Sequence, residues 1–167
     1  MKPILGASAL VLVLLAGVAF GTEPPAGYSD AVRWYQRAAE SGDANAQFLL
    51  GRMLESGVNR PRDPAAAAGW YRKAADQGHR LAQFALGLMY YAGRGVKQDY
   101  AEAAAWYEKA AAQGLPEAEF NLANLYDRGL GVTRDPDKAR GWYEKAAAHG
   151  LARARERLSA DKQRSKP

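Results

Sequence analysis

The chain has 167 residues, of which 48% are hydrophobic, so it is long enough to bury the core of one domain. It contains no cysteine, which excludes disulfide bonds, thiolate metal sites, a cysteine nucleophile and the modified cysteine of a bacterial lipobox. The net charge of +5 is modest, and we expect it to favour acidic proteins, anionic polymers or membrane surfaces, with no nucleic-acid partner.

The N-terminus has the pattern of a secretory signal peptide. Met1 and Lys2 form a short positive segment, residues 4–20 are an almost uninterrupted apolar run, and Ala19-Phe20-Gly21 places small residues at a cleavage point. We expect residues 1–21 to be removed, residues 22–27 to form a short linker, and the mature protein to be periplasmic or secreted without stable membrane insertion. The alternative is an uncleaved N-terminal membrane anchor, because about 17 apolar residues suffice to span a bilayer.

From residue 28 onward the sequence repeats itself every 36 residues. The pair Trp-Tyr occurs at 34–35, 70–71, 106–107 and 142–143, and alanines, glycines and leucines recur in the same register. This periodicity predicts an all-α solenoid of four helix-turn-helix units. The predicted domain covers 28–160, with units near 28–62, 63–98, 99–134 and 135–160, and a disordered basic tail follows at 161–167.

Repeated aspartates and glycines predict where the helices begin and end. The first helix of a unit should begin after an aspartate that accepts hydrogen bonds from free backbone amides, in two units followed by a proline that fits the first helical position. These aspartates are Asp63, Asp99 and Asp135. Glycines in the left-handed conformation should end the first helices at 42, 78, 114 and 150 and the second helices at 57, 93 and 129. Pro116 should start the second helix of the third unit.

The apolar positions predict how the helices pack. On the first helix Trp70 and Tyr71 share one stripe with alanines, so we interpret the Trp-Tyr pairs as core. The second helix has an apolar stripe around Leu86 and a second one that contains Phe84, which should contact the next unit. In the last unit the Phe position holds Glu156, as a polar terminal face requires.

Two segments carry a family resemblance. AAAWYEKAAAQGLPEAEFNLANLYDRGLGV at 103–132 and AAGWYRKAADQGHRLAQFALGLMYYAGRGV at 67–96 resemble the Sel1-like repeat, a branch of the tetratricopeptide-like helical repeats. The resemblance implies a right-handed α/α superhelix that acts as an adaptor, and it implies scaffold or regulatory roles for exported bacterial members. We expect a monomer. A cysteine-rich subgroup is linked to β-lactam binding, but its disulfide-bonded hairpins are absent here, so that activity is not inferred.

No catalytic residue, metal ligand or cofactor is predicted. His79 and His149 lie 70 residues apart beside helix-ending glycines, where a turn on the surface explains them. We therefore expect a protein that is not an enzyme. Two alternatives stay open: an envelope hydrolase or β-lactam-binding protein, and a scaffold associated with peptidoglycan or polysaccharide. The features that favour the latter are Tyr91 and the basic loop residues Arg94, Lys97 and Arg134.

A partner-binding face is predicted on the first helices. Positions opposite the Trp-Tyr stripe cannot be core, and stacked units would align them along one concave groove. Positive charge in the first two units, and small residues at 69, 105 and 141, suggest that an extended acidic segment of a protein partner binds there. The alternative is an ordinary solvated face. The candidate contacts are Arg33, Arg37, Arg72, Lys73, Lys109 and Lys145.

Overall fold

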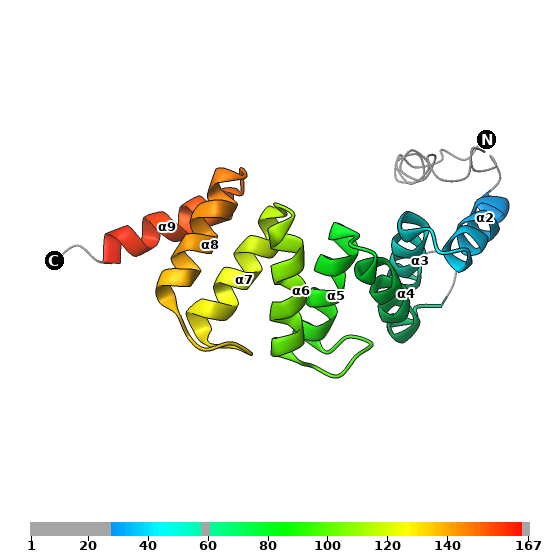
Figure 1. The fold of residues 1–167 in the computed structure, drawn as a ribbon, viewed down its shortest axis with the longest axis horizontal. Helices are drawn as coiled ribbons and strands as arrows, with labels where there is room; N and C mark the ends of the chain where they lie inside the picture. The colour runs from blue at the N-terminus through cyan, green and yellow to red at the C-terminus, as the bar shows by residue number, and fades with distance from the viewer. Residues whose placement is uncertain (1–27, 58–60, 165–167) are drawn as a thin grey trace, which may run out of the picture. The chain divides into compact units, whose positions relative to one another are not determined.

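The computed structural model describes residues 28–57 and 61–164, and over these residues it contains eight α-helices and no strand (Figure 1). The all-α prediction is therefore confirmed. The predicted signal peptide and linker lie outside the described residues. Each helix has 13 residues. The helices are α2 (Tyr28–Glu40), α3 (Ala44–Ser56), α4 (Pro64–Asp76), α5 (Arg80–Ala92), α6 (Tyr100–Ala112), α7 (Pro116–Arg128), α8 (Pro136–Ala148) and α9 (Ala152–Arg164).

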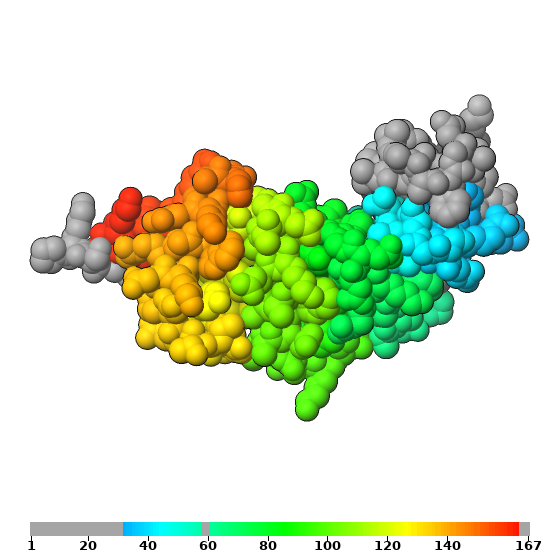
Figure 2. Space-filling view, viewed as in Figure 1, coloured from blue at the N-terminus to red at the C-terminus, as the bar shows by residue number. Residues whose placement is uncertain are grey.

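The chain forms two compact units that divide between His79 and Arg80. In the N-terminal unit α3 packs against both α2 and α4. In the C-terminal unit each helix from α5 to α9 packs against the next one along the chain. Figure 2 shows that side chains fill the spaces between successive helices of the C-terminal unit.

Local side chains set the helix boundaries as predicted. The carboxylates of Asp63 and Asp135 each accept a hydrogen bond of 2.9 Å from the backbone N–H three residues later, and Asp99 accepts bonds from two amides. Every glycine predicted to end a helix has a positive φ, from 66° at Gly93 to 102° at Gly42. Gly131, in the loop after α7, also has a positive φ of 68° and lies directly against the backbone of Tyr100 and Ala101 at the start of α6.

The tyrosine of each Trp-Tyr pair forms the centre of the core. Tyr71, Tyr107 and Tyr143 are at most 2% exposed, and burial raises the pKa of the Tyr107 and Tyr143 hydroxyls. A phenylalanine of the preceding helix packs on each ring, with centroid distances of 5.8 Å, 5.8 Å and 5.3 Å. One of these is Phe84 on Tyr107, so the predicted contact between neighbouring units is confirmed.

The tryptophans differ from the prediction. Trp106 is buried, but Trp34, Trp70 and Trp142 are only partly buried. A tyrosine and a tryptophan that follow each other on a helix point about 100° apart, so one stripe cannot bury both rings equally. The tyrosine occupies the core, and the tryptophan lies at its margin.

Close packing explains the glycine in the middle of the second helix. A Cβ at Gly87 would lie 2.6 Å from the ring of Tyr107, and one at Gly51 would lie 2.7 Å from Tyr71. The equivalent residue in α7 is Ala123, and there the Tyr143 ring is inclined by 59° to Phe120, compared with 40° between Tyr107 and Phe84. The core around Tyr143 therefore contains a methyl group at this position, and there the phenylalanine and tyrosine rings are inclined more steeply to each other.

A pair of alanine substitutions separates this packing effect from helix propensity. Alanine is favoured over glycine in a helix by about 1 kcal/mol. Gly69→Ala, where nothing lies within 4 Å of the added Cβ, is expected to stabilise the chain by up to that amount. Gly87→Ala is expected to destabilise it by about 1–2 kcal/mol because the Tyr107 ring must move. Urea denaturation of both variants checks the prediction, and equal effects would contradict it.

The last helix continues beyond its predicted end. α9 reaches Arg164, so the prediction that disorder begins at 161 is wrong, while 165–167 lie outside the described residues. The reason is Arg157, which pairs with Asp161 on its own helix and, at 2.8 Å, with Asp127 on α7. The Asp127 carboxylate raises the pKa of the Arg157 guanidinium. Glu156 is exposed, as expected for a polar outer face.

Candidate partner-binding face

Three first helices carry the same pair of side chains, a tryptophan and a lysine. The ammonium nitrogen of the lysine three residues after each tryptophan lies over the indole ring, 4.0 Å from its centroid in α4, 3.7 Å in α6 and 3.9 Å in α8. These are cation–π contacts between helical neighbours. We call them the Trp–Lys pairs: Trp70 with Lys73 in the N-terminal unit, and Trp106 with Lys109 and Trp142 with Lys145 in the C-terminal unit.

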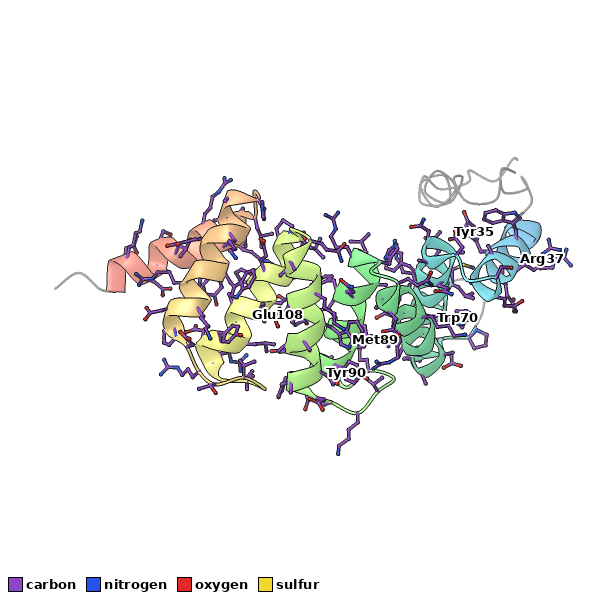
Figure 3. All side chains as sticks on the ribbon, in the orientation of Figure 1. Tyr35, Arg37, Trp70, Met89, Tyr90 and Glu108 are labelled. Atoms are coloured by element: carbon purple, nitrogen blue, oxygen red, sulfur yellow. The ribbon has the colours of Figure 1, made fainter. Side chains whose placement is uncertain are left out.

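The six predicted contact residues fall into two sets. Arg33 and Arg37 lie on α2, and Arg72 and Lys73 on α4, all in the N-terminal unit. Lys109 on α6 and Lys145 on α8 belong to the C-terminal unit. Arg72 is partly buried and the other five are exposed, and Arg37 projects from α2 in Figure 3. The prediction that the lysines lie opposite the tryptophans is wrong, because each lysine rests on the tryptophan of its own helix.

The three Trp–Lys pairs differ in whether the indole N–H has a hydrogen-bond acceptor within the protein. Trp106 is 4% exposed, and its indole N–H donates to the Glu102 carboxylate at 3.1 Å. Trp70 and Trp142 are partly exposed, and no acceptor for their indole N–H is found among residues 28–57 and 61–164. Each of these two follows a glycine, Gly69 or Gly141, where an added Cβ would meet nothing within 4 Å.

Helix α2 carries a related arrangement. Trp34, Arg37, Ala38 and Ser41 line an open pocket of about 230 Å³. Arg37 stands three residues after Trp34, as the lysines do in the later helices. The Ser41 hydroxyl donates to the Arg37 carbonyl at 2.9 Å, so it satisfies an acceptor near the end of the helix. The pocket places a cation beside an aromatic ring in the N-terminal unit as well.

A series of polar pairs between neighbouring helices was not predicted from the sequence. Buried Gln47 and Gln83 accept hydrogen bonds of 2.8 Å from Gln77 and Gln113, each 30 residues later. The third pair of the series consists of Glu119 and His149, with 2.9 Å between the Glu119 carboxylate and His149 Nδ1. Glu119 is only 1% exposed. Polar residues at 47, 83 and 119 within an apolar helix pattern were the available signal.

The histidines are more than surface turn residues. His149 follows α8 as its cap and reaches the buried Glu119. His79 stacks on Phe48, with ring centroids 4.7 Å apart, and is hydrogen-bonded to Asn45. Both imidazoles therefore tie a helix end to an earlier helix.

Other predicted features have structural roles. Tyr91 packs edge-on against Tyr100 with ring centroids 5.4 Å apart, and Arg134 donates to the Asp127 carbonyl at 2.9 Å. Among residues 28–57 and 61–164 there is no group of three His, Cys, Asp or Glu side chains that could hold a metal ion. In the same ranges no helix has the length and apolar character needed to cross a membrane.

Comparison with known proteins identifies the repeat. The Sel1 repeat matches residues 13–43, 44–79, 80–115 and 116–151. The first match begins within the predicted signal peptide, and the others begin at the second helix of our predicted units. This phase puts each Phe–Tyr contact, from Phe48 with Tyr71 onward, inside one matched repeat. No curated protein gives a significant match.

Solved structures of Sel1 repeat proteins have folds similar to that of this chain. A protective antigen of uropathogenic Escherichia coli strains with an SLR fold is 43% identical, with a TM-score of 0.69, over 71% of this chain and 26% of that chain. A Sel1 repeat protein from Oxalobacter formigenes is 35% identical, with a TM-score of 0.78, over 85% of this chain and 41% of that one. The chain thus spans less than half the length of either protein. Helicobacter pylori cysteine rich protein B, at 24% identity, shares the fold, with a TM-score of 0.59 over 75% of this chain and 90% of that one.

The Sel1 repeat fold is generally a protein–protein interaction scaffold and is typically not catalytic. Four matched repeats that cover most of the sequence show that this chain belongs to the Sel1 repeat family.

Proposed function

We propose that this protein is an interaction scaffold of the bacterial cell envelope that binds acidic, extended segments of a partner protein at its Trp–Lys pairs. The observation that carries the proposal is the repeated placement of a lysine ammonium over an indole ring, which is partly exposed at Trp70 and Trp142. The signal-like pattern of residues 1–21 supports export.

Each Trp–Lys pair favours a carboxylate as its ligand for two reasons. A lysine held over an aromatic ring keeps its charge while its alkyl chain covers apolar surface, so little side-chain freedom is lost when an anion binds. The neighbouring indole excludes water from one side of the ammonium, which strengthens its attraction for a carboxylate. An aspartate or glutamate next to an apolar residue matches this pair of groups.

The charges are strongest in the N-terminal unit. Across α2 and α4 the four basic residues Arg33, Arg37, Arg72 and Lys73 outnumber the three acidic residues Asp30, Glu40 and Asp76. On α6 and α8, glutamates directly precede the lysines. We therefore assign the larger share of the attraction to the N-terminal unit.

Charge reversal tests the proposal. Changing Arg33, Arg37, Arg72 and Lys73 to Glu is expected to weaken binding of a fluorescent peptide of alternating Glu and Ala by at least about tenfold. Fluorescence anisotropy at a fixed salt concentration measures the affinity, and a pull-down from an envelope fraction follows natural partners.

The control carries the same change in charge elsewhere. Arg52, Lys97, Arg140 and Lys162 are exposed basic residues outside the predicted contacts, and their reversal to Glu lowers the net charge equally. We expect this variant to bind within about threefold of the parent chain, because general attraction contributes less than direct contact. Equal weakening by both variants, or no weakening by the first, would refute the proposed site.

A further inference from the structure

We infer that Trp70 in the N-terminal unit and Trp142 in the C-terminal unit each bind, as separate sites, a carboxylate side chain of a partner segment through the indole N–H, in the way that Trp106 binds Glu102 within the protein. The inference rests on the proposed function and deepens it, because it names the atoms that recognise the partner.

The internal example defines the chemistry. Glu102 lies one helical turn before Trp106, and its carboxylate accepts the indole N–H at 3.1 Å. The Lys109 ammonium lies 3.7 Å from the centroid of the same ring. A carboxylate, an indole donor and a cation thus occupy one site on α6. The Trp106 side chain at this site is only 4% exposed.

The equivalent sites on α4 and α8 contain the cation and the ring but lack the carboxylate. One turn before Trp70 stands Ala66, and one turn before Trp142 stands Lys138. The Lys138 ammonium has donors only, so it cannot accept the indole N–H, and it lies 3.6 Å from the Asp135 carboxylate. Within the part of the chain that the structure describes, both indole donors are open to an acceptor from outside.

The surroundings leave room for that acceptor. Trp70 and Trp142 are partly exposed, and the glycines beside them, Gly69 and Gly141, meet no atom within 4 Å of an added Cβ. A hydrogen bond to a charged acceptor is roughly twice as strong as a neutral one, and the adjacent lysine favours the charged form. An aspartate or glutamate side chain of the partner therefore fits better than an amide.

Nuclear magnetic resonance observes the proposed contact directly. In the ¹⁵N-labelled chain the indole N–H signals can be assigned by Trp→Phe variants and followed while the Glu-Ala peptide is added. The signals of Trp70 and Trp142 should shift with the binding curve, the Trp106 signal should shift less, and a peptide with Gln in place of Glu should shift none. If the peptide binds by anisotropy but Trp70 and Trp142 do not shift, the inference fails while the proposed function stands. If the peptide does not bind, the proposed function fails as well.

A substitution that copies Glu102 into the N-terminal unit gives a second test. Ala66→Glu places a carboxylate one turn before Trp70, as Glu102 stands before Trp106, and an acidic residue in the first turn is compatible with the helix. Binding of the Glu-Ala peptide is expected to weaken by about three- to tenfold because the site is occupied from within. Ala65→Glu adds the same charge at an exposed position that does not face the indole, and it should weaken binding by less than about twofold. Equal weakening by the two variants would overturn the inference.

Discussion

Replacing Gly131 by alanine is expected to lower the free energy of unfolding by about 2–5 kcal/mol. Two effects add. The residue has a φ of 68°, which a side chain resists, and its Cβ would lie 2.2 Å from the carbonyl carbon of Tyr100 and 2.3 Å from the amide nitrogen of Ala101. Since these neighbours are backbone at the start of α6, they cannot turn aside as a side chain would. Chemical denaturation of the full chain, followed by circular dichroism, measures the loss.

Gly150→Ala is the matched control. Gly150 also has a positive φ, 95°, but nothing lies within 4 Å of an added Cβ. This variant is expected to lose only the conformational part, about 1–2 kcal/mol. If Gly131→Ala costs no more than Gly150→Ala, the close approach between the loop and α6 does not contribute to stability.

Removing the partner of the buried carboxylate should also be costly. His149→Ala is expected to lower the free energy of unfolding by about 1–3 kcal/mol, because Glu119 is then left in the core without its hydrogen bond. The Glu119 side chain is 2% exposed, whereas the His149 side chain is 48% exposed, so water can enter from one side only. Denaturation monitored as for the glycine variants provides the measurement.

Earlier repeats of the chain suggest a substitution that should restore the lost stability. Gln47 with Gln77, and Gln83 with Gln113, form the same contact in earlier repeats with neutral side chains. The double variant Glu119→Gln, His149→Gln should therefore recover stability to within about 1 kcal/mol of the parent chain. A double variant no more stable than His149→Ala would show that the pairs are not interchangeable.

The helix boundaries could be predicted from the sequence because local chemistry decides them. Asp63, Asp99 and Asp135 cap their helices through bonds to residues two or three positions away, and the glycines adopt their left-handed conformation within a single residue. The contact between Phe84 and Tyr107 was predictable for a different reason: a second apolar face on a helix requires a second neighbour.

The binding face could be predicted only in part. The sequence identified the basic residues of the first helices, but it treated the tryptophans as core and placed the lysines on the opposite side. Which ring of Trp-Tyr enters the core depends on the rotation of the helix against its neighbours, and periodicity fixes that rotation only roughly. The indole bond to Glu102 and the pair of Glu119 with His149 depend on side-chain rotamers, which no spacing rule supplies.

The polar pairs between helices join residues exactly one constant interval apart in every repeat: Gln47 to Gln77, Gln83 to Gln113 and Glu119 to His149, each separated by 30 positions. These contacts join helices that are neighbours along the chain, so each repeat contacts only the repeats next to it. We therefore expect folding to begin at any helix pair and spread to its neighbours, and partial unfolding to release single hairpins while the remainder stays intact.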